Sequence, residues 1–523
     1  MSDAVTTAAP LMQSEERAPL RVFWPAVTLT LSSAASMALE IVAGRALAPY
    51  VGMSLYSWTM VIAVVLAGLS LGHWLGGLLA DRTARPARFV ALALSTAALA
   101  TLLSLGALRM AAPGLEGTSP VAHAGFLAFA AFFLPSALAG LLAPLLTVIA
   151  LSATPPERQG RVLGLMFALG AAGAIIGTLA AGLVMISWLG TAGSVGLIAA
   201  VYAILAIRFW RAWASASIAS AGVAVLALVS PGALGLASAC MTESAYFCIR
   251  VDNASGFGRP GRVMVLDHLA HGVNDYRDPR FLLSPYVHGV DELVGARFPG
   301  DTLDAFFVGG GAYTLPRAWQ ERYPKGRFVV AELDPAVSET AKRHLWFTPA
   351  ARTEIRHGDA RRVLTGLPAA ERFDVIFGDA FHDVTIPAHL VTHEFAEAVA
   401  GRLRPGGIYA MNVVDALREP IFALSLATTL RASFGHVELW LDRQAIGPGE
   451  ARTTWILLAS DRAMTADGIE AGYGFGRDWV RVPLDDMMRA VGRERIVFLT
   501  DDYAPVDRLL APVLFDPALG NGG

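Results

Sequence analysis

The sequence has few cysteines, and its first half has little charge. Only two of the 523 residues, Cys240 and Cys248, are cysteines, so the chain can form one internal disulfide at most. The first 240 residues hold 11 of the 41 basic residues and 7 of the 44 acidic ones, and none of these 11 is lysine. So low a density of charge is typical of a membrane domain, whereas the remaining residues have the composition of a soluble domain.

Seven segments of the first half lack charged side chains or nearly so. Each approaches or exceeds the roughly 20 apolar residues that a helix needs to cross the hydrocarbon core of a bilayer. The sequence therefore predicts a polar tail at 1–21 and a transmembrane domain of about seven helices at 22–240, in the cell (inner) membrane. The segments are 22–44, 55–80, 89–108, 121–151, 162–188, 189–207 and 212–239.

The arginines of this half indicate a topology. If the N-terminus is cytoplasmic, nine arginines lie on the inner side of the seven spans, and only Arg45 and Arg109 lie on the outer side. This distribution follows the positive-inside rule and, with an odd number of spans, places everything after residue 240 outside. An oxidising compartment would permit Cys240 and Cys248 to pair, although two isolated cysteines are an equally good interpretation.

After residue 240 the pattern changes to short strands. The runs "YFCIRVD" and "RVMVLDH" alternate between apolar and polar residues and predict a hairpin within a small β-domain at 241–300. Five strand-like runs separated by helical patterns follow, from "LDAFFV" to "GIYAMNVV", with "HVELWL" and "TTWILLAS" expected at the edge. They predict a parallel, doubly wound α/β domain at 301–523. Because acidic residues outnumber basic ones 37 to 30 in this half, no nucleic-acid partner is expected.

Ligands of such sheets bind at the carboxyl ends of the strands. The first strand ends in three glycines, which allow the backbone to come close to a ligand. The second ends in Glu332, the place where an acidic residue accepts hydrogen bonds from ribose hydroxyls. Asp359 and Asp379 end the third and fourth strands, and each, like Asp334, also suits a helix N-cap or a turn. Together these ends predict one nucleoside-shaped site that includes Gly309, Gly310 and Gly311.

From about Glu243 to Leu458 the sequence resembles the spermidine synthase (polyamine aminopropyltransferase) family. The whole chain, including "SMALEIVAGRALAPYVGMSLYSW" in the first span and beyond, resembles the membrane-fused bacterial branch of that family. The motifs in the soluble half that carry the resemblance occur in the family's order: "ESAYFCIRV", "VMVLDHLAH", "VGGGAYTLPR", "VVAELD", "HGDAR", "FDVIFGDAF", "IPAHLVTHEF" and "LRPGGIYAMNV".

The resemblance implies a class I S-adenosylmethionine-methyltransferase-like (Rossmann-like) domain after a small β-region. It also implies transfer of a propylamine group from decarboxylated S-adenosylmethionine to an amine such as putrescine, with methylthioadenosine as the second product. No tightly bound cofactor and no metal are expected. Glu332 would hold the ribose, Asp359 and Ala360 the adenine side, and Asp379 the attacking amine. On the substrate side the resemblance implies His271, Tyr286, His382 and Asp383.

Three positions depart from the family pattern. Ala312 stands where the soluble enzymes carry an aspartate that is thought to hold the propylammonium of the cosubstrate. Residues 379–383, "DAFHD", stand in place of the family's DSSDP-like gate. The second aspartate of that gate is therefore either replaced by His382 or shifted by one position to Asp383. Phe247 stands where the family has a glutamine. A dicationic diamine needs anionic partners when it leaves water, and this pocket offers fewer of them.

Two other functions therefore stay open. The first is methyl transfer from S-adenosylmethionine itself, since loss of the ammonium-holding aspartate removes one reason to prefer the decarboxylated form. The second is a transporter or membrane sensor whose soluble domain only binds a nucleoside or a polyamine. The expected partners are the lipid bilayer, a small amine and, as a further candidate, a second copy of the chain.

Overall fold

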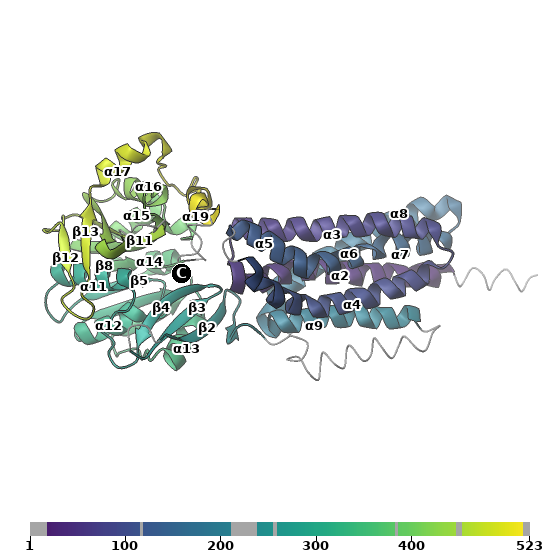
Figure 1. Ribbon diagram of the computed structural model, residues 1–523, viewed down its shortest axis with the longest axis horizontal. Coiled ribbons are helices and arrows are strands. Elements are labelled where there is room, and N and C mark those ends of the chain that lie inside the picture. Colours follow the sequence, from purple (N-terminus) through teal and green to yellow (C-terminus); the bar gives the residue numbers. More distant parts are fainter. Residues whose placement is uncertain are drawn as a thin grey trace, which may run out of the picture. The chain divides into compact units, whose positions relative to one another are not determined.

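The computed structural model describes residues 18–115, 119–210, 238–254, 259–381, 385–445 and 452–515 (Figure 1). Contacts within the chain divide it into two compact units. The first is helical and consists of residues before Cys240, and the second consists mainly of Cys240 and the residues after it. Each unit is described by itself below.

The helical unit is a bundle of long apolar helices that lie side by side (Figure 1). Within the described residues, five helical stretches are long and apolar enough to cross a membrane, which supports the predicted multi-pass membrane region. The helices are α2 (Ala18–Val51), α3 (Leu55–Arg82), α4 (Pro86–Ala111), α5 (Pro120–Ala128), α6 (Leu134–Gly140), α7 (Leu142–Ser152), α8 (Gln159–Ala180) and α9 (Ile186–Trp210).

The fifth stretch, Pro156–Phe209, has 54 residues and comprises two passes. Gly173 packs against the backbone of Thr30, and Gly177 packs against that of Ala34, so α8 runs parallel to α2. The two glycines leave no room for a Cβ between the helices, as expected where small residues let helices approach closely.

Helix α9 runs in the opposite direction. The hydroxyl of Tyr202 donates to the carbonyl of Ser32 over 3.4 Å, and the Arg208 guanidinium lies 4.9 Å from the ring centroid of Trp24. The chain reverses at Gly190, whose φ of 65° and ψ of −179° interrupt the helix. The predicted spans at 162–188 and 189–207 thus correspond to separate passes, and the seventh predicted span, 212–239, lies outside the described residues.

Helix α3 packs on α6 and its neighbours through a row of glycines. Gly68, Gly72 and Gly76 are spaced four residues apart and therefore lie on one face of the helix. A Cβ on any of them would meet a backbone carbonyl of the facing segment, and at Gly72 that carbonyl belongs to Ala137. Close backbone approach therefore fixes this pair of helices.

The second unit begins with a four-stranded antiparallel sheet. The predicted hairpin is confirmed, because β2 pairs with β3 in a register that places Ile249 opposite Leu266. Cys240 and Cys248 form a disulfide at the start of this sheet, so they are not isolated thiols. The strands are β1 (Thr242–Glu243), β2 (Cys248–Ala254), β3 (Gly261–Leu266) and β4 (Leu269–Asp275).

A larger sheet of nine strands follows, in the order β12-β13-β10-β11-β9-β8-β5-β6-β7. Its five predicted parallel strands are confirmed as neighbours on the β9-to-β7 side. The expectation that the last two predicted strands form the edge is wrong, because β13 pairs with β10 and β12 lies beyond it. The strands are β5 (Asp304–Val308), β6 (Arg327–Glu332), β7 (Thr353–His357), β8 (Phe373–Gly378), β9 (Leu403–Ala416), β10 (His436–Asp442), β11 (Arg452–Ser460), β12 (Gly468–Glu470) and β13 (Asp478–Val482).

Helices cover both faces of the large sheet, as a parallel sheet requires. The small sheet, α11, α12 and α13 share one hydrophobic core with the large sheet, formed by residues such as Ile249, Val290, Leu315, Val337 and Phe307. Helices α14, α15 and α16 bury a separate set of side chains. The class is thus an apolar helical region followed by an α/β domain with a mixed nine-stranded sheet and a small antiparallel sheet. The helices are α11 (Pro285–Arg297), α12 (Thr314–Arg322), α13 (Pro335–His344), α14 (Ala360–Gly366), α15 (His393–Ala400), α16 (Ile421–Leu430), α17 (Leu484–Val491), α18 (Val506–Leu509) and α19 (Ala511–Phe515).

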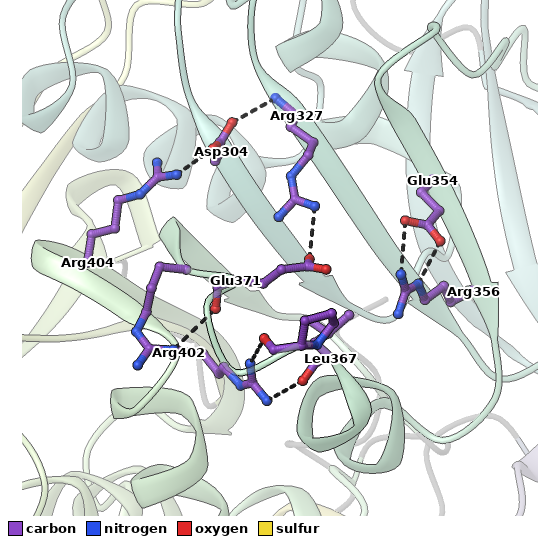
Figure 2. A network of polar contacts seen from close by, with 10 residues as sticks. Asp304, Arg327, Glu354, Arg356, Leu367, Glu371, Arg402 and Arg404 are labelled. Carbon is purple, nitrogen blue, oxygen red and sulfur yellow. Dashed lines mark hydrogen bonds and ion pairs between the residues drawn. The ribbon is translucent and has the colours of Figure 1, made fainter.

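Ion pairs hold the amino ends of the parallel strands together (Figure 2). Arg404 at the start of β9 contacts Asp304 of β5 at 2.6 Å and Asp374 of β8 at 2.8 Å. Arg327 at the start of β6 pairs with Glu371, just before β8, at 2.9 Å. These ion pairs align the amino ends of β5, β6, β8 and β9. The carboxyl ends of the same four strands therefore lie together at the other end of the strands.

The glycine row of α3 provides a test of helix packing. We expect Gly72→Ala to destabilise the helical unit by about 1–3 kcal/mol, because the new methyl group must displace the backbone at Ala137. The matched control is Gly77→Ala on the same helix, where a Cβ meets nothing within 4 Å among the described residues. Thermal unfolding of the full chain in detergent measures both variants, and equal melting temperatures would contradict this packing.

Candidate active site

A pocket lies at the carboxyl ends of β5, β6 and β8, between these strands and the small sheet. Its lining includes most of the residues that the sequence predicted, so Glu332, Asp359 and Asp379 open into one space and do not face different sides of the sheet. The predicted residues that line it are His271, Gly309, Gly311, Glu332, Asp359, Ala360 and Asp379.

The glycine turn after β5 forms one side of the pocket. Gly309 has a φ of 95° and Gly311 a φ of 49°, a backbone region that side chains with a Cβ rarely adopt. A Cβ on Gly309 would also come within 2.8 Å of the Asp379 carbonyl oxygen, and one on Gly310 would meet the ring of Tyr313. The turn therefore depends on glycine both for its dihedral angles and for its contact with the end of β8.

The carboxylate of Glu332 is buried beneath this turn. One oxygen accepts the N–H of Gly310 at 2.8 Å and that of Gly311 at 3.3 Å, and the other accepts the N–H of Asp334 at 2.9 Å. Burial raises the pKa of Glu332, and the three backbone donors act in the opposite direction. A carboxylate has about four acceptor positions, so one remains for a hydroxyl in the pocket.

Asp359 is the N-cap of α14 and accepts the N–H of Arg362 at 2.9 Å. Its second oxygen lies 2.6 Å from Nε2 of His389, a residue that the sequence did not single out. Desolvation opposes ionisation, but the hydrogen bonds from Arg362 and His389 outweigh it and lower the pKa of Asp359. The cap interpretation of Asp359 therefore holds, and a contact with adenine stays a prediction.

Asp379 accepts two hydrogen bonds from side chains. Asn412 on β9 donates through Nδ2 at 2.8 Å, and the Tyr286 hydroxyl at the start of α11 donates at 3.2 Å. Desolvation raises the pKa of Asp379 to about 6, although both hydrogen bonds favour its ionised form. Sequence reasoning missed Asn412, whose only signal was a polar residue inside the apolar run 408–414 of β9.

Apolar side chains form the rest of the wall. The Phe247 ring lies 6.5 Å from that of His271, centroid to centroid, and Leu333 and Phe381 also line the pocket. Ala312 is buried, and its carbonyl accepts a hydrogen bond from Asn274 at 2.9 Å. A methyl group thus stands where the family pattern has a carboxylate.

Two predicted residues, His382 and Asp383, lie outside the described residues. In the part of the chain that the structure describes, no group of three or more His, Cys, Asp or Glu side chains is placed to hold a metal ion. The polar side chains that line the pocket are carboxylates and imidazoles, and an amide and a phenol contact Asp379.

The Gly309 turn provides a test of the geometry. We expect Gly309→Ala to lower stability by about 1–3 kcal/mol and to displace the end of β8, because the backbone is strained and the new Cβ meets the Asp379 carbonyl. Thermal unfolding is the measurement. Gly366→Ala, where a Cβ meets nothing within 4 Å in the described structure, is the control. A Gly309→Ala protein that matches this control in melting temperature would refute the close approach.

Comparisons with known proteins identify relatives of the second unit. No family model matches the chain. A polyamine aminopropyltransferase of Vibrio vulnificus (strain CMCP6) is 33% identical over 142 residues, which are 26% of this chain and 46% of that protein. A polyamine aminopropyltransferase of Nitrosomonas europaea (strain ATCC 19718) is 33% identical over 215 residues, 39% of this chain and 60% of the relative.

Among solved structures, a probable spermidine synthase from Corynebacterium glutamicum ATCC 13032 is 23% identical, with a TM-score of 0.43 over 50% of this chain and 95% of that one. The chain spans about half the length of the curated relatives reported above. These relatives show that the C-terminal part of the chain is homologous to the polyamine aminopropyltransferases.

Proposed function

We propose that the protein is a membrane-anchored aminopropyltransferase that acts on putrescine or a similar amine. The observation that carries the proposal is that Glu332 and Asp379 open into one pocket beside the Gly309 turn. This pocket lies in the unit that is homologous to the polyamine aminopropyltransferases. The donor would be decarboxylated S-adenosylmethionine, bound as a cosubstrate.

The reaction requires placement and one proton acceptor. The nitrogen of the amine attacks the propyl carbon next to the sulfonium, a carbon–nitrogen bond forms, and the carbon–sulfur bond breaks with its electron pair going to sulfur. Methylthioadenosine leaves, and the nitrogen loses a proton. In this proposal Asp379, held by Asn412 and Tyr286, orients the amine and accepts that proton, and Glu332 holds the sugar.

A second candidate is methyl transfer from S-adenosylmethionine. The buried Ala312 favours it, because a methyl group offers no partner for the propylammonium of the decarboxylated donor. The two reactions use the same nucleoside pocket and differ in the second product, which is methylthioadenosine in one case and S-adenosylhomocysteine in the other.

The side of the membrane is also a proposal. The arginine distribution and the Cys240–Cys248 disulfide both support a position of the second unit opposite the cytoplasm, where disulfides persist. A donor made in the cytoplasm would then have to reach that compartment, or the unit acts there on a different, exported substrate.

A product assay tests the proposed activity. The purified full chain, incubated with putrescine and decarboxylated S-adenosylmethionine, is expected to release methylthioadenosine, as followed by mass spectrometry. We expect Asp379→Asn to lower kcat by about 10²–10⁴-fold, the usual contribution of a positioned acid–base group, with methylthioadenosine affinity changed less than about threefold. Asp252→Asn, at an exposed residue of β2, controls for the loss of a charge.

The other outcomes separate the alternatives. Production of S-adenosylhomocysteine from S-adenosylmethionine, without methylthioadenosine, would replace the proposal by methyl transfer. Neither product, with nucleoside binding intact, would favour a sensor or a transporter. Full activity of Asp379→Asn would contradict the role given to that residue.

The pKa of Asp379 predicts the pH dependence of the reaction. A carboxyl with a pKa of about 6 is ionised above that pH, so kcat/KM should fall about tenfold per pH unit below it. Asn412→Ala removes a donor that favours the ionised form, so the pKa rises further and the acidic limb moves to higher pH. The exposed Asn253→Ala is the control. A flat profile between pH 5 and pH 8, within about twofold, would contradict the assignment.

A further inference from the structure

The helical unit contains a second cavity that the proposed reaction does not use. It has a volume of about 470 Å³ and lies between the turn that joins α3 to α4 and the end of α9. Three arginines in or beside this turn line one part of the cavity, and apolar side chains line the other. The residues that matter are Arg82, Arg85, Arg88, Phe89, Leu92 and Phe209.

The cavity lies at one end of the helix bundle. The same end holds the start of α2, because Arg208, next to Phe209, lies over the ring of Trp24. Phe23 and Trp24 are 52% and 40% exposed there. Aromatic and basic side chains at the ends of apolar helices mark the level of the lipid headgroups, so the cavity opens where headgroups lie.

The charges of the turn are unbalanced. Residues 81–88 contain three arginines and one acid, Asp81. Arg82 and Arg85 are both exposed, and Asp81 is the one acidic residue beside them in this segment. A guanidinium forms bidentate hydrogen bonds with phosphate oxygens, and a second arginine nearby strengthens the attraction.

The opposite wall is apolar. Phe89 and Phe209 are half-buried, and Leu92 lies one turn further along α4. This wall offers no hydrogen-bonding or charged partner to a soluble phosphate or nucleotide. It can pack against the methylene groups of an acyl chain. The cavity thus combines an arginine-lined rim with an apolar wall.

We propose that this cavity binds an anionic phospholipid, with the headgroup phosphate on Arg82 and Arg85 and the upper part of an acyl chain against Phe89 and Phe209. Basic pockets between membrane helices bind anionic lipid headgroups in this manner. The bound lipid would fix the turn between α3 and α4 to the end of α9. The site is separate from the pocket at Asp379 and does not depend on the proposed reaction.

Native mass spectrometry of the full chain, released from detergent with added lipid, tests the proposal. The probes are phosphatidylglycerol and phosphatidylcholine of the same chain length. We expect the unaltered protein to retain phosphatidylglycerol more strongly than phosphatidylcholine. In the double variant Arg82→Gln/Arg85→Gln we expect the affinity for phosphatidylglycerol to fall about 30-fold, which corresponds to ~5-fold for each arginine.

The control removes the same charge elsewhere. Arg158 and Arg161 are exposed at the start of α8, which lies at the same end of the bundle, and do not line the cavity. Arg158→Gln/Arg161→Gln is therefore expected to retain phosphatidylglycerol as the unaltered protein does. An equal loss in both double variants would mean a general surface charge effect and would overturn the site.

Two other results would also overturn it. Equal retention of phosphatidylcholine would show an apolar groove without headgroup recognition. Displacement of phosphatidylglycerol by millimolar inorganic phosphate would show a site for a soluble anion. A fluorescence-detected elution profile of each variant verifies that the protein remains folded, so that a loss of lipid is not a loss of the protein.

Discussion

The candidate site depends on the close approach between the Gly309 turn and the end of β8. The N–H of Gly309 donates to the carbonyl of Ala331 on one side, and the N–H of Asp379 donates to the carbonyl of Val308 on the other. Three strand ends are thereby held at fixed distances from each other. The position of Glu332 below the turn and that of Asp379 beside it both follow from these contacts.

Each carboxylate of the pocket has a different environment, and the environment indicates what each can do. Glu332 is held by backbone donors, which suits a group that fixes a ligand. Asp379 is held by an amide and a phenol and is poorly solvated, which raises its pKa to about 6 and suits a group that exchanges a proton near neutral pH. Asp359 caps a helix and pairs with His389, so it stabilises the edge of the pocket whether or not it contacts adenine.

Much of the fold could be predicted from the sequence because its signals are local. The helical unit was predicted from apolar runs that are long enough to cross a bilayer. The parallel sheet, and the site at the carboxyl ends of its strands, were predicted from short apolar runs that end in Gly, Glu or Asp. Strands β12 and β13 were missed because they have only three and five residues, and they are stabilised by pairing, β13 with β10 and β12 with β13. Asn412 and His389 were missed for a related reason: they are far in sequence from Asp379 and Asp359, and only the folded chain brings each pair together.

A structure of the full chain with methylthioadenosine bound tests the central claim most directly, that the strand ends form one nucleoside site. The account predicts the ribose hydroxyls within about 3.2 Å of the Glu332 carboxylate and the sulfur of the ligand on the side of Asp379. A nucleoside bound away from the Gly309 turn, or with its sugar facing away from Glu332, would contradict the account.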